Sequence, residues 1–356
     1  LFCLTYGDEP AEEIHEGIRI CRYRTDKLEY KLSALAYTLP FYTNSMAKKI
    51  KEFVFLHEID VLHVHDMRIA GAAFKAIQNK KMPFVLDLHE NRPEIMKLYP
   101  HLQKFPGKYL IQPSVWKKKE RFFVEKASHT IVVTEEAKNE LLNRCTVLEK
   151  SIVVVPNTVR ESFYKEAIST TEVLEKYKNK FVLLYLGHTG LRRGLLTAIE
   201  SVSDLKNTIS NMKLVIVGKS SSDAVLKKKV QELGVDNDVD FVGWEDVSLF
   251  PSYIQASTIC ISPLHRNVHH DTTYANKIFQ YMSLGKPLLV SDATAQKTIV
   301  EKSKSGLIHI EKDSQDFTDK VLKLAFDENL RSQMGANGKA FVETEFSWEQ
   351  TSKNLV

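Results

Sequence analysis

A cation and two amide side chains share one face of a predicted helix in the second half of the chain. Residues 271–292 read DTTYANKIFQYMSLGKPLLVSD, and the polar face of this helix carries Asn276, Lys277 and Gln280. The opposite face is apolar at helical spacing and consists of Ala275, Ile278, Phe279 and Met282. A positive charge and amides at a helix start suit the phosphates and sugar of a nucleotide. A solvated polar face is the other interpretation, and spacing alone does not decide.

The residues around this face predict how it is positioned. Thr272 or Thr273 is expected to cap the helix, and Gly285 is expected to end it in a left-handed turn. The apolar run Leu288–Val290 follows, as in a strand that is covered on both faces.

A second candidate phosphate site lies in FVLLYLGHTGLRRGLLTAIE. This stretch predicts a strand, a loop that contains Gly187, His188, Arg192 and Arg193, and a helix that begins near Gly194. A diphosphate needs cations and free N–H groups, and two arginines beside a helix start supply both. The alternative is a surface loop with solvated arginines.

Histidines and carboxylates end two predicted strands in the first half. His89 and Glu90 close FVLDLHE, and His65 and Asp66 close HVHD. Ligand groups gather at the carboxyl ends of strands in open α/β sheets. We expect Glu90 to orient the ring of His89. His65 and Asp66 are candidates for an acceptor side, although a structural role is favoured for them.

A third group of histidines, His265 with His269 and His270 beside Asp271, resembles a metal cluster at first sight. Its spacing fits no standard zinc pattern. We expect direct contacts to a bound ligand or plain exposure to solvent, and no metal.

Three of these motifs resemble those of family 4 glycosyltransferases. Residues 276–287 are similar to the donor-site helix written N-K-x-F-E-Y-M-x-x-G-x-P, and Arg193 stands where the family's phosphate loop has lysine. The V-x-D-x-H-E pattern ending at Glu90 resembles the segment with the family's cleft histidine, here His89. The resemblance implies α/β architecture of the GT-B type, with two Rossmann-like domains whose parallel sheets face across a cleft.

The family's function supplies the remaining expectations. The resemblance implies a retaining hexosyltransferase that moves a sugar from a nucleotide-diphospho-sugar to a glycan or lipid-linked acceptor, without a metal or other cofactor. His89 and Glu90 are then the catalytic residues. The donor-binding residues implied are Gly187, His188, Arg192, Arg193, Thr272, Asn276, Lys277 and Gln280.

The chain departs from the family pattern at its acidic positions. In the related E-x7-E pattern, Thr272 takes the first position and Gln280 the second, so neither carries a carboxylate. This leaves open a catalytically weak paralogue that serves as a scaffold or binding protein. A two-domain nucleotide-sugar epimerase is a further alternative, because it shares the architecture. We also expect the family's first strand, glycine-rich turn and first helix to be missing upstream of Leu1.

Bulk composition agrees with a two-domain protein. The chain has 356 residues with a net charge of +4, and its four cysteines lack the spacing of a metal site or a disulfide framework. No apolar run is long enough to span a membrane. We therefore expect a cytoplasmic protein without a nucleic-acid partner, and the family resemblance implies polysaccharide biosynthesis at the cell envelope. Basic and aromatic residues on a predicted helix are a candidate contact with the inner face of an anionic membrane: Trp116, Lys117, Lys118 and Lys119.

Apolar runs alternate with helical stretches along both halves. Strands are expected in the first half at 1–6, 18–23, 61–64, 84–87, 130–133 and 152–155, and in the second at 181–186, 213–217, 240–242, 258–262, 288–290 and 307–310. Helices are expected at 43–58, 67–79, 115–128, 135–143, 194–206, 223–233, 247–256, 273–284, 295–303 and 314–341. The predicted organisation is an N-terminal domain at 1–156, a linker at 157–179, a nucleotide-sugar domain at 180–341 and the start of a C-terminal helix at 342–356 that returns toward the first domain.

Overall fold

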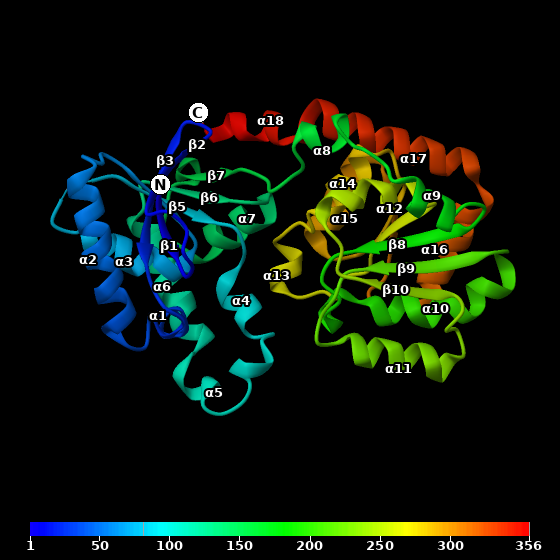
Figure 1. Ribbon diagram of the computed structural model, residues 1–356, viewed down its shortest axis with the longest axis horizontal. Helices are drawn as coiled ribbons and strands as arrows, with labels where there is room; N and C mark the ends of the chain where they lie inside the picture. Colours follow the sequence, from blue (N-terminus) through cyan, green and yellow to red (C-terminus); the bar gives the residue numbers. More distant parts are fainter. Residues whose placement is uncertain (81, 356) are drawn as a thin grey trace. The chain divides into compact units, whose positions relative to one another are not determined.

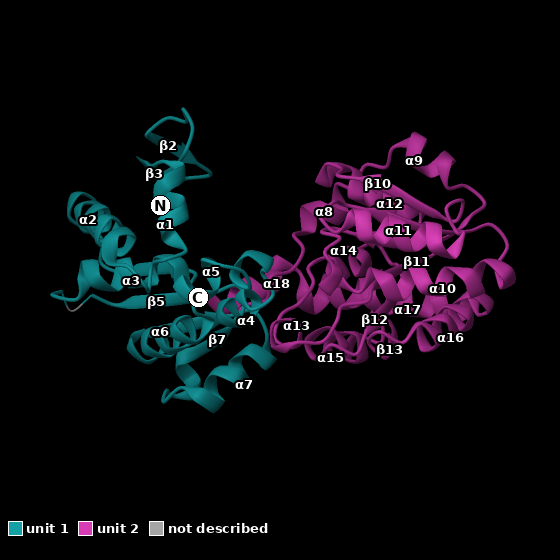
Figure 2. Ribbon diagram, turned by 90° about the horizontal axis from the view of Figure 1, so that it is seen from below, with its two compact units in different colours: residues 1–154 teal, residues 155–356 magenta. Residues whose placement is uncertain are grey.

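A computed structural model describes residues 1–80 and 82–355 of the chain. The chain forms two compact units, residues 1–154 and 155–356, which Figure 2 colours separately. This boundary lies two residues before the predicted end of the first domain. No helix among the described residues has the length and apolar character needed to cross a membrane.

Unit 1 is built on a parallel sheet in the order β4-β5-β6-β7. Its strands are β4 (Leu62–His65), β5 (Phe84–Leu88), β6 (His129–Val132) and β7 (Ile152–Val154). The main helices are α2 (Pro40–Leu56), α3 (Met67–Ile77), α6 (Pro113–Lys126) and α7 (Glu135–Arg144). Thr134 caps α7 by accepting a hydrogen bond from the Ala137 amide at 2.9 Å. The predicted strands and helices of this sheet are confirmed to within a few residues.

A smaller sheet in unit 1 contains one strand that the sequence analysis missed. It has the order β1-β3-β2, with β1 (Phe2–Thr5), β2 (Glu12–His15) and β3 (Ile18–Arg24). β2 pairs antiparallel with β3 through a turn at Glu16 and Gly17, whose φ angles are 48° and 81°. Such a two-residue turn joins hairpin strands well. Shorter helices also lie outside the prediction, namely α1 (Lys27–Ser33), α4 (Arg92–Met96) and α5 (Gly107–Leu110).

Unit 2 holds six strands, all parallel, in the order β10-β9-β8-β11-β12-β13. They are β8 (Phe181–Leu186), β9 (Met212–Val217), β10 (Val239–Gly243), β11 (Ile259–Ser262), β12 (Leu288–Ser291) and β13 (Gly306–His309). All six predicted strands of this half are therefore confirmed.

Helices cover both faces of this sheet (Figure 1). One face packs against α10 (Leu195–Thr208), α11 (Asp223–Leu233) and α16 (Ser314–Phe326). The other packs against α12 (Phe250–Ala256), α14 (Lys277–Ser283), α15 (Thr294–Ser303) and α17 (Glu328–Phe341). Alternate residues of β8 enter the two cores, since Leu184 lies in one and Leu183 in the other. A strand covered on both faces is apolar throughout, which explains the continuous apolar runs in the sequence.

The predicted linker is not an irregular segment. Residues 157–179 contain α8 (Glu161–Lys165) and α9 (Thr171–Lys176), and Val173 and Tyr177 are buried in the core of unit 2. The predicted helix 314–341 is also interrupted, because Asp327 ends α16 and caps α17 by accepting from the Leu330 amide at 2.8 Å. The C-terminal residues continue through a π-helical turn, Val342–Phe346, into α18 (Trp348–Thr351).

The predicted membrane contact at residues 116–119 is wrong for Trp116, and it stays a prediction for the three lysines. Trp116 is buried, with its ring 4.8 Å from that of Tyr37. Lys117 forms ion pairs with Glu94 at 2.9 Å and with Glu140 at 3.5 Å. Trp116 therefore packs within unit 1, whereas Lys117 is half-buried and Lys118 and Lys119 are exposed.

Candidate active site

Glycines shape the loop between β8 and α10. Gly187 ends the strand with a φ of 108°, and Gly194 precedes the helix with a φ of 75°. A Cβ atom on Gly194 would lie 1.6 Å from the carbonyl oxygen of Pro263. The loop that carries Arg192 and Arg193 is therefore fixed at both ends by positions that accept only glycine.

Gly194→Ala is expected to lower the free energy of unfolding by more than about 3 kcal/mol, because it combines backbone strain with a clash against Pro263. Gly234→Ala is the matched control, since Gly234 has a φ of 62° but nothing within 4 Å of a Cβ atom. The control should cost only the backbone strain, about 1–2 kcal/mol. Urea denaturation of both variants measures the difference. Equal losses would show that the contact with Pro263 relaxes freely.

Glycines stand at the carboxyl ends of three adjacent strands of unit 2, so this edge of the sheet carries no side chains at these positions. Gly187 and Gly218 directly follow β8 and β9, and Gly243 ends β10, with φ angles of 108°, 143° and 93°. The Gly218 amide donates to the Gly243 carbonyl at 2.6 Å, and a Cβ atom on Gly218 would lie 1.9 Å from the Gly187 oxygen. The absence of side chains lets a ligand approach the backbone closely at this edge.

Two cations lie beside this glycine edge. The Lys277 ammonium is 3.5 Å from the centroid of the Tyr185 ring and 3.4 Å from where a Cβ atom on Gly187 would lie. Burial and the neighbouring Arg193 guanidinium lower the pKa of Lys277 well below its usual range. Within residues 1–80 and 82–355, neither Lys277 nor Arg193 forms an ion pair with a carboxylate, and the buried Nε of Arg193 has no hydrogen-bond partner. The two cations are thus free to bind an anion.

His188 completes the loop on the same side. Its Nδ1 accepts a hydrogen bond from the Gly190 amide at 3.1 Å. Desolvation first, and then Arg193 and Arg192, lower the pKa of His188. A neutral ring that accepts at Nδ1 carries its proton on Nε2 and can donate from there.

The donor-site helix begins later than predicted. α14 starts at Lys277, with the exposed Asn276 as its N-cap residue. Gly285 follows the helix with a φ of 72°, as predicted. The amide side chain of Gln280 is half-buried and makes no hydrogen bond to the described part of the chain, so it is available to a ligand.

The two threonines before α14 do not cap it. Thr272 donates from its hydroxyl to the Val268 carbonyl at 2.7 Å, and Thr273 donates to the His269 carbonyl at 2.6 Å. Both side chains are buried, and both close the short helix α13 (Val268–Asp271). The prediction of a threonine N-cap is therefore wrong, because these hydroxyls find carbonyls in the preceding turn. Thr272 as a donor contact stays a prediction.

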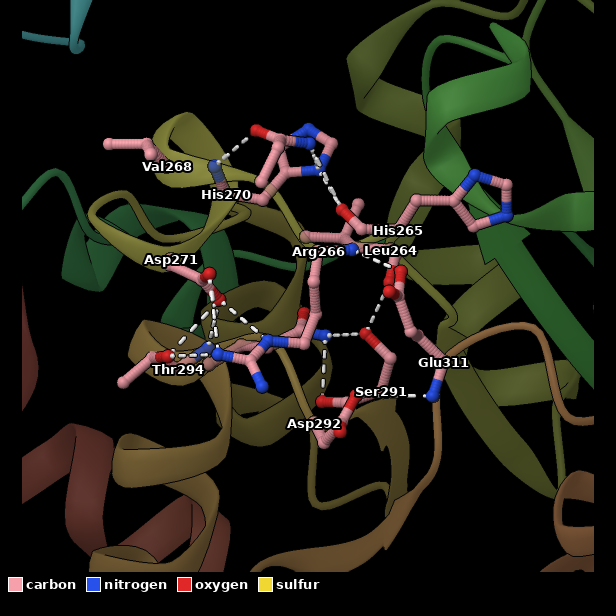
Figure 3. Close-up of polar contacts among 12 residues, drawn as sticks. Leu264, His265, Arg266, Val268, His270, Asp271, Ser291, Asp292, Thr294 and Glu311 are labelled. Atoms are coloured by element: carbon pink, nitrogen blue, oxygen red, sulfur yellow. Dashed lines mark hydrogen bonds and ion pairs between the residues drawn. The ribbon is translucent and has the colours of Figure 1, made fainter. Parts of the chain in front are cut away.

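The carboxylate next to Thr272 is already engaged (Figure 3). Asp271 accepts from the Thr294 amide at 2.7 Å and forms an ion pair with Arg266 at 3.2 Å. The Arg266 amide in turn donates to Glu311. Asp271 thus holds the segment before α14 against the start of α15, and it does not replace the acid that the family pattern has at Thr272.

Two histidines of the same segment are buried and neutral. Desolvation lowers the pKa of His269 to about 3 and that of His270 to about 4. The His270 Nδ1 bonds the His265 carbonyl at 2.7 Å, which Figure 3 also shows. Plain exposure to solvent is therefore wrong for His269 and His270. The orphan Nδ1 of His269 is one more polar atom beside the arginine loop, since both arginines influence its ring.

In unit 1, histidines gather around one carboxylate that the sequence analysis did not single out. Asp87 lies 3.1 Å from His63, 3.3 Å from His65 and 3.6 Å from His89. The His65 Nδ1 and the His89 Nε2 are 2.9 Å apart. The ring of His89 is therefore oriented by Asp87 and His65, at the carboxyl ends of β4 and β5.

The predicted pairing of Glu90 with His89 is wrong. Glu90 forms an ion pair with Arg92 at 2.5 Å, two residues along the chain. The guanidinium is closer and fully charged, which makes it the stronger partner for a carboxylate. Burial raises the pKa of the nearby Asp66, whose Oδ1 has no hydrogen-bond partner among the described residues.

One group in this cluster has the ligand types of a metal site. The ligand atoms of His63, His65 and Asp87 all lie within 4.8 Å of one another. Two imidazoles and a carboxylate are a common ligand set for zinc and iron. The expectation that no metal takes part in catalysis stays a prediction.

Comparison with known proteins assigns both units. The family model for group 1 glycosyl transferases matches residues 168–341, and the model for Glycosyltransferase Family 4 matches residues 1–163. The chain belongs to the family 4 glycosyltransferases. The group 1 match covers the arginine loop and α14, and the family 4 match covers the histidine cluster.

Several curated proteins that this chain resembles are named glycosyltransferases. An uncharacterised glycosyltransferase of Methanocaldococcus jannaschii is 21% identical over 99% of this chain and 87% of its own length. The capsular polysaccharide biosynthesis glycosyltransferase CapM of Staphylococcus aureus is 24% identical over 63% of this chain. The matched part spans 60% of CapM and 58% of a second glycosyltransferase of Methanocaldococcus jannaschii.

Solved structures confirm the GT-B fold. Sucrose-phosphate synthase from Thermosynechococcus elongatus superimposes with a TM-score of 0.78 at 16% identity, covering 99% of this chain and 86% of the other. HepE from Anabaena, solved in complex with UDP, gives a TM-score of 0.71 at 15% identity over 94% of this chain and 84% of the other. The predicted α/β architecture with two Rossmann-like domains is thus confirmed.

Proposed function

We propose that this protein is a retaining glycosyltransferase that moves a sugar from a nucleotide-diphospho-sugar to a glycan or lipid-linked acceptor. Family membership supports the reaction class, and the UDP complex of the structurally similar HepE supports a nucleotide donor. CapM, which is named for capsular polysaccharide biosynthesis, supports a role in cell-envelope polysaccharide synthesis. The cytoplasm stays the proposed location. The family assignment does not support a nucleotide-sugar epimerase.

The proposed donor site rests on one observation. Arg193 and Lys277 lie beside a side-chain-free strand edge without a carboxylate partner in the described residues. A diphosphate between them would satisfy both cations and the open backbone of the glycine edge. Gln280, one helical turn beyond Asn276, would then reach the ribose hydroxyls through its unpaired amide.

The chemistry asked of these residues is charge stabilisation. The leaving nucleoside diphosphate gains negative charge as the bond to the sugar breaks, and fixed cations stabilise that charge without rearranging. His89, held by Asp87 and His65, is proposed to hydrogen-bond the reacting sugar. Glu90 is not needed to orient it, and its proposed part is limited to the Arg92 ion pair.

A panel of ligands tests the proposal. UDP, GDP and their glucose, mannose and N-acetylglucosamine conjugates would be added to the protein in a thermal-shift assay, and sugar release would be followed with each conjugate. We expect one nucleotide series to raise the midpoint of unfolding and the matching sugar to be released slowly without acceptor. A protein that binds none of them at millimolar concentration would contradict a donor site.

Gln280 distinguishes the active enzyme from a scaffold. Gln280→Ala is expected to weaken donor binding by about 0.5–1.5 kcal/mol, the value of a neutral hydrogen bond. Gln280→Glu should keep or raise turnover, because a carboxylate accepts ribose hydroxyls more strongly. Calorimetry and turnover for the three proteins side by side give the answer. If no change at position 280 affects any nucleotide, the scaffold alternative gains support.

Lys277 predicts a pH dependence. Its pKa is lowered by burial in the free protein, and a bound diphosphate would raise it by favouring the ammonium form. Affinity for the nucleotide-sugar should therefore be full below the free-state pKa and should fall as the pH rises through it. Lys277→Arg should bind without this dependence, since arginine stays charged. Calorimetry at several pH values tests this, and parallel curves for both proteins would exclude Lys277 as the titrating group.

A further inference from the structure

The stretch of unit 1 from the end of α4 into the first half of α6 lacks acidic residues. Residues 95–119 contain six lysines and no aspartate or glutamate. Two of the lysines, Lys97 and Lys117, form ion pairs with Glu94. Among residues 1–80 and 82–355, the exposed Lys104, Lys108 and Lys118 find no carboxylate partner. The segment therefore presents net positive charge to its surroundings.

Large apolar side chains stand out from the same segment. Phe105 is 84% exposed and Tyr109 is 66% exposed, and Leu110 beside them is 43% exposed. We call residues 104–110, KFPGKYL, the tip segment. It contains α5, which Figure 1 shows beyond α6 and away from the strands of unit 1.

The tip segment is anchored to the body of unit 1. The Leu110 carbonyl accepts from the Thr38 hydroxyl at 2.6 Å, and Ile111 next to it is buried. These contacts tie the carboxyl end of the tip segment to unit 1, while the rings of Phe105 and Tyr109 stay exposed. Exposing such rings costs free energy in water, so a partner that covers them would stabilise this arrangement.

We propose that the tip segment is a docking surface for an anionic membrane. Aromatic and aliphatic side chains flanked by lysines match the interface of a bilayer, where rings enter the headgroup region and ammonium groups meet lipid phosphates. A glycan would not need the aliphatic side chain of Leu110. An acidic protein partner would not favour an apolar surface as small as that of Phe105, Tyr109 and Leu110. This surface differs from Trp116, which is buried in unit 1, and from Lys117, which is paired with Glu94.

The location suits the proposed function. The chain leaves the histidine cluster at the end of β5, passes through α4 and then forms the tip segment. An enzyme that docks by this segment would hold its first unit at the surface where a lipid-linked acceptor resides. The benefit of docking for reaching a lipid-linked acceptor rests on the proposed function, but binding to lipid does not depend on it.

Vesicle flotation tests the proposal. Wild-type protein would be mixed with vesicles that contain about 30% phosphatidylglycerol in phosphatidylcholine, and with phosphatidylcholine alone. We expect flotation with the anionic vesicles, reduced by high salt. Phe105→Ser with Tyr109→Ser, and separately Lys104→Glu with Lys108→Glu, should each reduce the bound fraction at least tenfold.

Matched controls separate the surface from general charge and hydrophobicity. Phe326→Ser removes an equally exposed ring in unit 2, and Lys227→Glu with Lys228→Glu reverses two lysines on α11. Both should float like the wild type. Wild-type protein that stays unbound, or tip variants that float normally, would overturn the proposal. A wild-type dimer that the tip variants dissociate would assign the surface to a second copy instead. Nucleotide affinity, measured on the same samples, reports the donor site independently.

Discussion

Arg193→Ala is expected to weaken binding of the nucleoside diphosphate by about 1.5–3 kcal/mol, the value of a hydrogen bond to a charged group. The guanidinium lies in the loop that Gly187 and Gly194 fix, its Nε lacks a partner among the described residues, and it is close enough to Lys277 to lower that residue's pKa. Removing the guanidinium leaves the diphosphate with one cation fewer, in a partly desolvated site where charge interactions are stronger than in water. Isothermal titration with the nucleotide that binds best measures the loss.

Two further variants make this result specific. Arg193→Lys keeps the charge but loses the two-pronged geometry, so it should recover part of the affinity. Lys228→Ala removes an exposed cation from α11 and should leave affinity unchanged. Unchanged affinity in Arg193→Ala would remove the diphosphate from this loop, whereas an equal loss in Lys228→Ala would point to net charge as the cause.

His89→Ala is expected to lower kcat by about 100-fold or more, as when an enzyme loses one donor that stabilises its transition state. Donor affinity should stay within a factor of two, because the proposed contact is with the sugar and not with the nucleotide. Initial rates and calorimetry on the same preparation separate the two quantities.

His129→Ala is the control for His89, since His129 is an exposed histidine at the opposite end of a neighbouring strand. It should retain full turnover. Asp87→Asn would remove the charge that orients the His89 ring and should lower kcat less than His89→Ala does. A His89→Ala enzyme with kcat within a few-fold of wild type would make the histidine cluster structural.

The four inner strands of the unit 2 sheet, β9, β8, β11 and β12, could be predicted from sequence because they are buried on both faces. Each of these four reads as a mainly apolar run, and the runs recur between helical stretches. The β2 strand could not be predicted in this way, since Glu12–His15 is mostly exposed and carries no apolar pattern. Its only sequence signal is Gly17, one glycine after a charged residue.

The sequence predicts which residues form the site, but it does not predict which partners they contact. Glycine after an apolar run marks the strand ends at Gly218 and Gly243, and this signal could have added both to the site. The partner of His89 was beyond sequence reasoning, because Asp87 points to the histidines only once β4 and β5 lie in register. Likewise, Thr272 reads as an N-cap until the turn of α13 supplies its carbonyls.

A crystal structure of this protein with the nucleoside diphosphate that binds best would test directly whether Arg193 and Lys277 form the donor site. We expect phosphate oxygens within hydrogen-bonding distance of the Arg193 guanidinium and the Lys277 ammonium, over the glycine edge at Gly187. Gln280 should contact the ribose in the same structure. A diphosphate bound elsewhere on the chain, in contact with neither Arg193 nor Lys277, would contradict the proposed donor site.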